Sequence, residues 1–151
     1  MEGASLQVIS FAFNRECSMR KLIIIGVVGL ISGCVASSDI MNNNFPAVVV
    51  AIPPASMVGA WTGSMGPYST TIKVEADGGG YMCYSWNGKD VLSRIKYSGS
   101  QIVVSDGSKL DVGEVTKSTM QVDANYYMGA SYTMYKDDEL KSASPYCSKN
   151  I

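Results

Sequence analysis

The feature that most constrains the fold is a two-residue alternation of apolar and polar side chains in the C-terminal part of this 151-residue chain. Ile72 and Val74, for example, alternate with Lys73 and Glu75, so one face of the segment is apolar and the other is polar. This pattern is typical of a β-strand with one buried face. Because the apolar spacing of an amphipathic helix is missing, we expect residues 58–151 to form an all-β domain.

Short turn sequences divide this region into about eight strands. Asp77-Gly78-Gly79-Gly80 supplies residues that adopt positive φ at low cost, and Asn87-Gly88 is the strongest β-hairpin signal in the chain. Consecutive tight turns make neighbouring strands antiparallel, and a meander of this size can close into a barrel and so remove its exposed edges. An eight-stranded barrel is just wide enough to be filled by its own side chains, so a large ligand cavity is not expected. The expected strands are one through Trp61 and those at residues 70–76, 81–86, 91–97, 101–105, 109–115, 119–124 and 131–135.

Upstream of this domain, the chain has the organisation of a secretory signal. Arg20-Lys21 precedes the uncharged, apolar residues 22–31, a stretch shorter than the roughly 20 residues that a transmembrane helix needs. Ile31-Ser32-Gly33-Cys34 then resembles the lipobox of bacterial lipoproteins, in which an apolar residue and two small residues precede an acylated cysteine. The resemblance implies that residues 19–33 are a lipoprotein signal peptide and that Cys34 is lipidated and becomes the mature N-terminus.

The remaining N-terminal residues divide into two parts. Residues 1–18 place an acidic residue and a cysteine before the positively charged region, so they are interpreted as an over-long start and Met19 as the better one. Residues 34–57 are interpreted as the lipidated cysteine and a tether, rich at first in Ser and Asn. Within the tether, the proline-framed apolar residues 46–54 are predicted to dock on the domain as an edge strand or as a stiff extended segment. A strand that binds a partner is the alternative.

Charge and the expected lipid suggest where the protein is held. From Cys34 onward, nine Lys and Arg oppose eleven Asp and Glu, a net charge of −2 with no cluster, so nucleic acid is not an expected partner. Attachment to the membrane is expected through the lipid on Cys34. In the lipoprotein family, an Asp directly after the lipidated cysteine holds the protein at the inner membrane. Val35 stands there instead, which indicates the outer membrane, facing the periplasm.

Two cysteines remain once the signal is removed and Cys34 is lipidated. Cys83 and Cys147 are 64 positions apart, and export places them in an oxidising compartment where disulfides form and persist. Closing such a loop stabilises a fold by about 4 kcal/mol in the chain-entropy model. We therefore expect one disulfide that closes the barrel-like domain. A metal-binding or redox pair is not expected, because the spacing is not Cys-x-x-Cys and the chain has no histidine.

The absence of histidine also limits the chemistry. It excludes Ser-His-Asp and Cys-His catalysis and histidine-based zinc sites. Asp77, Asp90, Asp106 and Asp123 all lie at turns or strand ends, where Asp is expected for its local backbone hydrogen bonds. We therefore predict a protein that is not an enzyme, with no catalytic residue, metal or cofactor.

The aromatic residues are the candidates for either the core or a binding face, because tyrosine has an apolar body and a polar tip. Strand alternation places Tyr84 and Trp86 together on one face with Met82, and places Tyr132 on the inner side of the last strand with Tyr135 outside. The residues singled out in this way are Trp61, Tyr84, Trp86, Tyr127, Tyr132 and Tyr135.

Two family resemblances bear on function. Gly59-Ala60-Trp61 resembles the Gly-x-Trp start of lipocalin-type barrels, which implies that Trp61 plugs one end of the barrel. Tyr81-Met82-Cys83, Gly129-Ala130-Ser131-Tyr132 and Cys147 are similar to the membrane-bound inhibitors of C-type lysozyme, a lipidated family with a small disulfide-closed barrel. The inhibitory motif of that family has a Ser where Met128 stands here.

Together these features predict a lipoprotein of the outer membrane that binds an envelope protein partner or supports the envelope. Inhibition of C-type lysozyme and transport of a small apolar ligand are the alternatives. A pocket lined by Tyr84, Trp86 and Tyr132 would indicate the ligand carrier, and a protruding polar loop would indicate the inhibitor.

Overall fold

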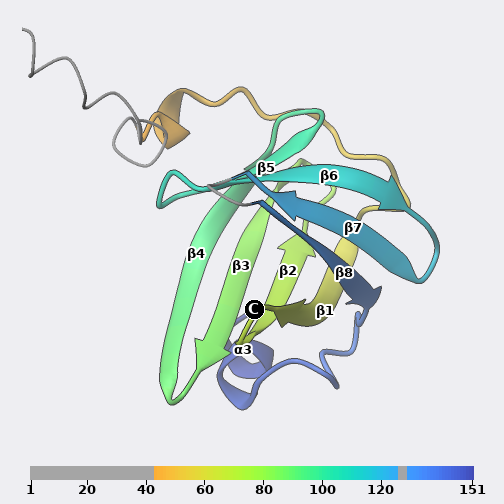
Figure 1. Cartoon of the computed structure of the whole chain (residues 1–151). Helices are drawn as coiled ribbons and strands as arrows, with labels where there is room; N and C mark the ends of the chain where they lie inside the picture. The colour runs from red at the N-terminus through yellow and green to blue at the C-terminus, as the bar shows by residue number, and fades with distance from the viewer. Residues whose placement is uncertain (1–42, 126–128) are drawn as a thin grey trace, which may run out of the picture. The chain divides into compact units, whose positions relative to one another are not determined.

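The computed structural model describes residues 43–125 and 129–151, which form a closed barrel of eight antiparallel strands arranged in chain order (Figure 1). The predicted all-β meander is therefore confirmed. The expected strands 109–115 and 119–124 coincide with the observed ones, and the others differ by one or two residues at their ends. The strands are β1 Gly59–Met65, β2 Tyr68–Val74, β3 Gly79–Trp86, β4 Lys89–Tyr97, β5 Gln101–Val104, β6 Lys109–Val115, β7 Thr119–Ala124 and β8 Ala130–Lys136.

The hairpin predicted at Asn87-Gly88 joins β3 to β4. Both residues have positive φ, 49° for Asn87 and 75° for Gly88, as a type I′ turn requires. This turn matches the twist of the flanking strands, so β3 and β4 pair along their length from Gly79↔Lys96 to Trp86↔Lys89. The turn chemistry thus sets the register of the longest hairpin in the barrel.

The barrel closes where its first strand meets its last. β1 pairs with β8 through Trp61↔Lys136 and Thr62↔Tyr135. β4 pairs with β5 only through its last three residues, opposite Ile102, Val103 and Val104. The barrel is thus continuous around its circumference, but the first part of β4 extends beyond its pairing with β5 (Figure 1).

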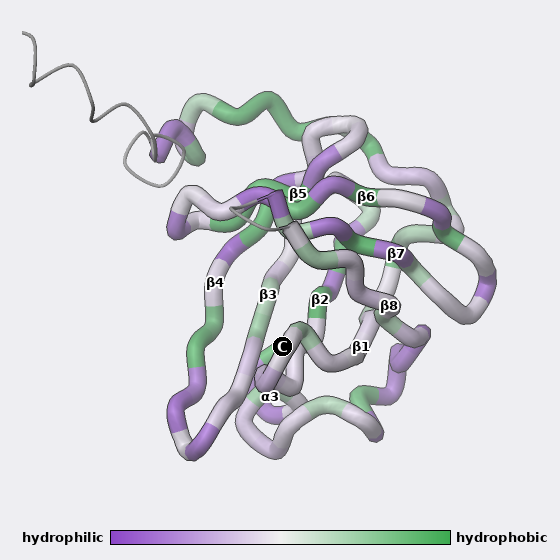
Figure 2. The backbone as a smooth tube through the Cα atoms, viewed as in Figure 1, coloured by the Kyte–Doolittle hydropathy of each residue, from purple (hydrophilic) through white to green (hydrophobic). Residues whose placement is uncertain are grey.

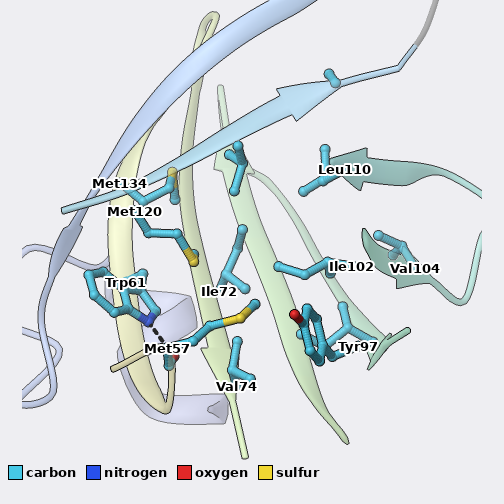
Figure 3. Close-up of a cluster of buried hydrophobic side chains, with 13 residues drawn as sticks. Met57, Trp61, Ile72, Val74, Tyr97, Ile102, Val104, Leu110, Met120 and Met134 are labelled. Atoms are coloured by element: carbon cyan, nitrogen blue, oxygen red, sulfur yellow. Dashed lines mark hydrogen bonds between the residues drawn. The ribbon is translucent and has the colours of Figure 1, made fainter. Parts of the chain in front are cut away.

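Apolar side chains fill the interior of the barrel. Trp61 is completely buried, and its indole Nε1–H donates a hydrogen bond to the backbone oxygen of Met57 at 2.8 Å (Figure 3). The ammonium of Lys136 lies over the face of the indole, 4.5 Å from the ring centroid. The core thus extends back to Met57, in the segment before β1. The buried cluster comprises Met57, Trp61, Ile72, Val74, Ile95, Tyr97, Ile102, Val104, Leu110, Met120, Val122, Ala124 and Met134.

A short C-terminal helix, α3 Pro145–Asn150, packs against β3 and β4 on the outside of the barrel. Its first turn is capped by the Ser144 hydroxyl oxygen, which accepts a hydrogen bond from the Cys147 backbone amide at 3.2 Å. The predicted disulfide between Cys83 and Cys147 is present, and both residues are completely buried. Cys83 faces outward on β3, so α3 and the disulfide cover what would otherwise be an exposed face.

The apolar segment before β1 forms no strand. After the 3₁₀ turn η1 Phe45–Ala47, the chain passes across the end of the barrel where β2 turns into β3 and β4 turns into β5 (Figure 1). A single backbone bond from the Ala51 amide to the Tyr97 carbonyl, 2.8 Å long, joins it to β4 there. No helix among the described residues is long and apolar enough to cross a membrane.

Candidate functional site

The most distinctive surface feature is a cluster of three aromatic side chains, which we call the aromatic platform: Tyr68, Tyr84 and Trp86. Strand alternation places Tyr84 and Trp86 on the same face of β3, as the sequence predicts. β2 pairs with β3 through Ser69↔Ser85, so Tyr68 at the start of β2 lies next to Trp86 at the end of β3. The platform therefore lies beside the β1–β2 and β3–β4 turns, at the opposite end of these strands from the segment that precedes β1.

The Tyr68 ring contacts the rings of Tyr84 and Trp86, and the cluster remains accessible. The rings of Tyr68 and Tyr84 are T-shaped, with centroids 5.3 Å apart, and those of Tyr68 and Trp86 are tilted, with centroids 5.9 Å apart. Edge-to-face contacts of this kind add to the energy of burial, and they hold each ring in place. Tyr68 is 38% exposed and Trp86 is 46% exposed. A fixed, accessible aromatic surface of this kind suits an apolar partner or the face of a sugar ring.

The electrostatics of the platform keep its deepest hydroxyl neutral. Burial raises the pKa of Tyr84 above its ordinary value, and the negative charge of Asp106 and the neighbouring Tyr68 raise it further. A tyrosine hydroxyl is already protonated at physiological pH, and this shift favours the same form, so the Tyr84 hydroxyl can both donate and accept a hydrogen bond.

Behind the platform, on the outer face of β3, a polar network ties the strand to α3. The Ser85 hydroxyl donates a hydrogen bond to the Asp90 carboxylate, and its oxygen lies 2.6 Å from that of Ser144. The disulfide lies two residues earlier on the same face. The end of β3 is thus fixed on its outer side by covalent and polar contacts, which makes its inner side a rigid support for the aromatic rings.

The other residues singled out from the sequence lie elsewhere. Trp61 belongs to the core, Tyr132 packs against the core cluster, and Tyr135 is 59% exposed on the outer face of β8. Tyr127 and Cys34 lie outside the described residues. Sequence reasoning missed Tyr68, whose place in the platform depends on the register between β2 and β3. The described residues contain no group of three or more His, Cys, Asp and Glu side chains that could hold a metal ion.

A separate hollow of about 510 Å³ lies between the segment before β1 and the outer face of the barrel. Phe45 and Val50 line it from the segment, and Tyr81, Arg94 and Lys96 line it from β3 and β4. Both basic and acidic side chains face it, so its wall has no dominant charge.

The comparison with protein families shows to which family the chain is related. Residues 42–151 match the family model described as bacterial lipocalin LPS transport optimiser YedD. The chain belongs to the YedD family. The match includes the whole described barrel and agrees with the resemblance of Gly59-Ala60-Trp61 to the start of lipocalin-type barrels. No curated protein and no solved structure gives a match.

Proposed function

We propose that this protein is a lipid-anchored component of the bacterial cell envelope that assists the transport of lipopolysaccharide (LPS) without catalysing a reaction itself. The observation that carries the proposal is the family match over residues 42–151, since the family is described by its role in LPS transport. In this proposal the acylated Cys34 holds the protein in the outer membrane, and the barrel faces the periplasm.

The packed interior favours a binding scaffold over a carrier that encloses its ligand. Trp61, Ile72, Met120 and Met134 are all completely buried inside the barrel, so their side chains occupy the space that a small apolar ligand would need. Binding of an envelope partner must then use the surface. We assign this role to the aromatic platform, because exposed Trp and Tyr side chains are enriched among the residues that dominate binding energy.

The test combines a deletion strain with matched variants. Cells without the gene should deliver newly made LPS to the cell surface more slowly, and the wild-type gene should restore the rate. Trp86→Ala should fail to restore it, because loss of a central aromatic side chain costs about 2 kcal/mol of binding, or roughly a thirtyfold loss of affinity.

Tyr135→Ala is the matched control. Tyr135 is also an exposed aromatic residue, but it lies on the outer face of β8, away from the platform. It should restore LPS delivery fully at equal protein level. If Trp86→Ala and Tyr135→Ala behaved alike, the platform would have no part in the function, and an unchanged rate in the deletion strain would contradict the proposed function itself.

A further inference from the structure

The segment before β1 exposes apolar side chains that the barrel does not cover. Val49 and Ile52 are each 83% exposed, and Val50 is 40% exposed. In Figure 2 the tube is green along much of this segment, whereas along the strands it alternates between green and pale or purple. Because these side chains lie close together in the chain, they form one apolar strip, residues 49–52, on the outside of the molecule.

This strip is held in place by specific contacts. The ammonium of Lys96 donates hydrogen bonds to the backbone oxygens of Phe45, Pro46 and Val48 at 3.0, 3.2 and 3.2 Å. The same ammonium lies 4.9 Å from the centroid of the Phe45 ring. One half-buried lysine on the outer face of β4 therefore fixes the backbone that leads into the strip.

A glycine allows the strip to approach the barrel closely. A Cβ atom on Gly78 would lie 2.1 Å from the Ala51 carbonyl oxygen and 2.6 Å from Val50 Cγ1, so a side chain there would push the segment away. Together with the bond from the Ala51 amide to the Tyr97 carbonyl, this contact fixes the strip across one end of the barrel. A tether that only connected the barrel to its anchor would need neither the apolar side chains nor this fixation.

The short stretch of chain between Cys34 and the first described residue indicates that the strip faces a membrane. Asn43, the first described residue, is nine residues after Cys34, and nine residues span at most about 30 Å even when fully extended. If Cys34 carries acyl chains, Asn43 therefore stays within about 30 Å of the anchored cysteine, and the strip that follows it stays within reach of the bilayer surface. The hollow beside it combines Arg94 and Lys96 with Glu75 and Asp77, so its charges balance and neither attract nor repel a charged lipid strongly.

We propose that residues 49–52 form a membrane-contact surface that lies against the phospholipid bilayer in which the acylated Cys34 is anchored. This inference rests on the lipid anchor of the proposed function. Val49 and Ile52 enter the interfacial region of the bilayer, where exposed apolar side chains gain most from leaving water. The contact orients the barrel, with the end that carries the β2–β3 and β4–β5 turns toward the membrane.

The test uses the full chain, acylated in cells, purified and reconstituted in vesicles of phosphatidylethanolamine and phosphatidylglycerol. A photoreactive diazirine amino acid is placed at position 49, at position 52 or, as the control, at position 89 in the exposed start of β4. Lys89 is exposed and lies at the opposite end of β4 from Tyr97, which bonds to the strip. Because the photoproduct forms only with atoms in van der Waals contact, the yield of phospholipid adduct should be at least about tenfold higher at positions 49 and 52.

Each outcome decides the proposal. The yield of phospholipid adduct at positions 49 and 52 should change little between low and high salt, since the contact is apolar. A steep fall with salt would show an electrostatic contact and contradict the proposal. Equal yields at all three positions, with the acyl mass on Cys34 intact, would overturn the membrane contact and leave the anchor in place. A purified chain without acyl groups would overturn the anchor and the membrane contact together. In intact cells, adducts at positions 49 and 52 with a protein in place of lipid would also overturn the proposal.

Discussion

Replacement of Trp61 by alanine is the most direct test of how the barrel is held together. The side chain is completely buried, its N–H donates to the Met57 carbonyl at 2.8 Å, and the Lys136 ammonium lies over its ring. Trp61→Ala therefore removes the largest side chain of the core, leaves the Met57 carbonyl without its donor and exposes the interior where β1 meets β8.

The expected loss can be estimated from these contacts. Large-to-small substitutions of buried aromatic residues cost about 3–5 kcal/mol, a large part of the roughly 5–15 kcal/mol by which a domain is stable. With about 4 °C lost per kcal/mol for a domain of this size, the melting temperature should fall by about 12–20 °C. Trp61→Phe keeps a ring but loses the N–H, so it should cost about 1–3 kcal/mol for the unsatisfied carbonyl in addition to the lost volume.

Urea and thermal unfolding of a purified fragment of residues 35–151, followed by circular dichroism, would measure these losses. Trp86→Ala is the matched control, since it removes the same side chain from a position that is 46% exposed. It should cost less than about 1.5 kcal/mol, because much of the ring is already in water. Equal shifts for the two variants, or an unchanged midpoint for Trp61→Ala, would refute the role of Trp61 as the closing residue of the core.

Three further predictions follow from the remaining features. Cys34→Ser should abolish incorporation of a palmitate analogue, since the thiol is the predicted attachment point, and equal labelling of the variant would contradict the lipid anchor. Reduction of the disulfide between Cys83 and Cys147 should lower the free energy of unfolding by about 4 kcal/mol, and an identical urea midpoint with and without reductant would exclude this contribution. The pKa of Asp138 lies below its ordinary value, first because its carboxylate accepts a hydrogen bond from a backbone amide of β1 and also because a lysine lies beside it. Because the pKa of Asp138 is lower in the folded state, the ionised side chain stabilises the fold above the unfolded pKa. This stabilisation is lost as the pH falls through the folded pKa. Between pH 7 and pH 3, the free energy of unfolding should therefore fall less for Asp138→Asn than for the wild type. An equal fall in the two proteins would contradict the stabilising role of the Asp138 carboxylate.

Much of the barrel could be predicted because its turns and strands are determined by residues that are close together in the sequence. The positive φ that the β3–β4 turn requires is supplied by Asn87 and Gly88 themselves, and strands such as β2 and β7 carry their own alternation of apolar and polar residues. The short helix α3 was missed, since six residues are too few to show an apolar period. Its start signal was nevertheless present, in the Ser144 cap followed by Pro145.

The candidate site was predicted only in part, because its geometry depends on distant residues. Tyr84 and Trp86 lie on one face by strand alternation, but Tyr68 joins them through a register that no local pattern reveals. The choice between a strand and a docked segment before β1 depended on Lys96, which binds carbonyl groups about fifty positions earlier in the chain. Neither contact could be inferred from residues close together in the sequence.

The hairpin between β3 and β4 has a mechanical consequence. β3 has eight residues, and at about 3.3 Å per residue it is about 26 Å long. With the strip at residues 49–52 against the bilayer, the strand is a spacer that displays the aromatic platform at a height of up to about 26 Å, clear of the lipid headgroups. This height is set by hydrogen-bonded strands, so adding residues to the tether would leave it unchanged, whereas adding residue pairs to β3 and β4 would raise the platform in steps.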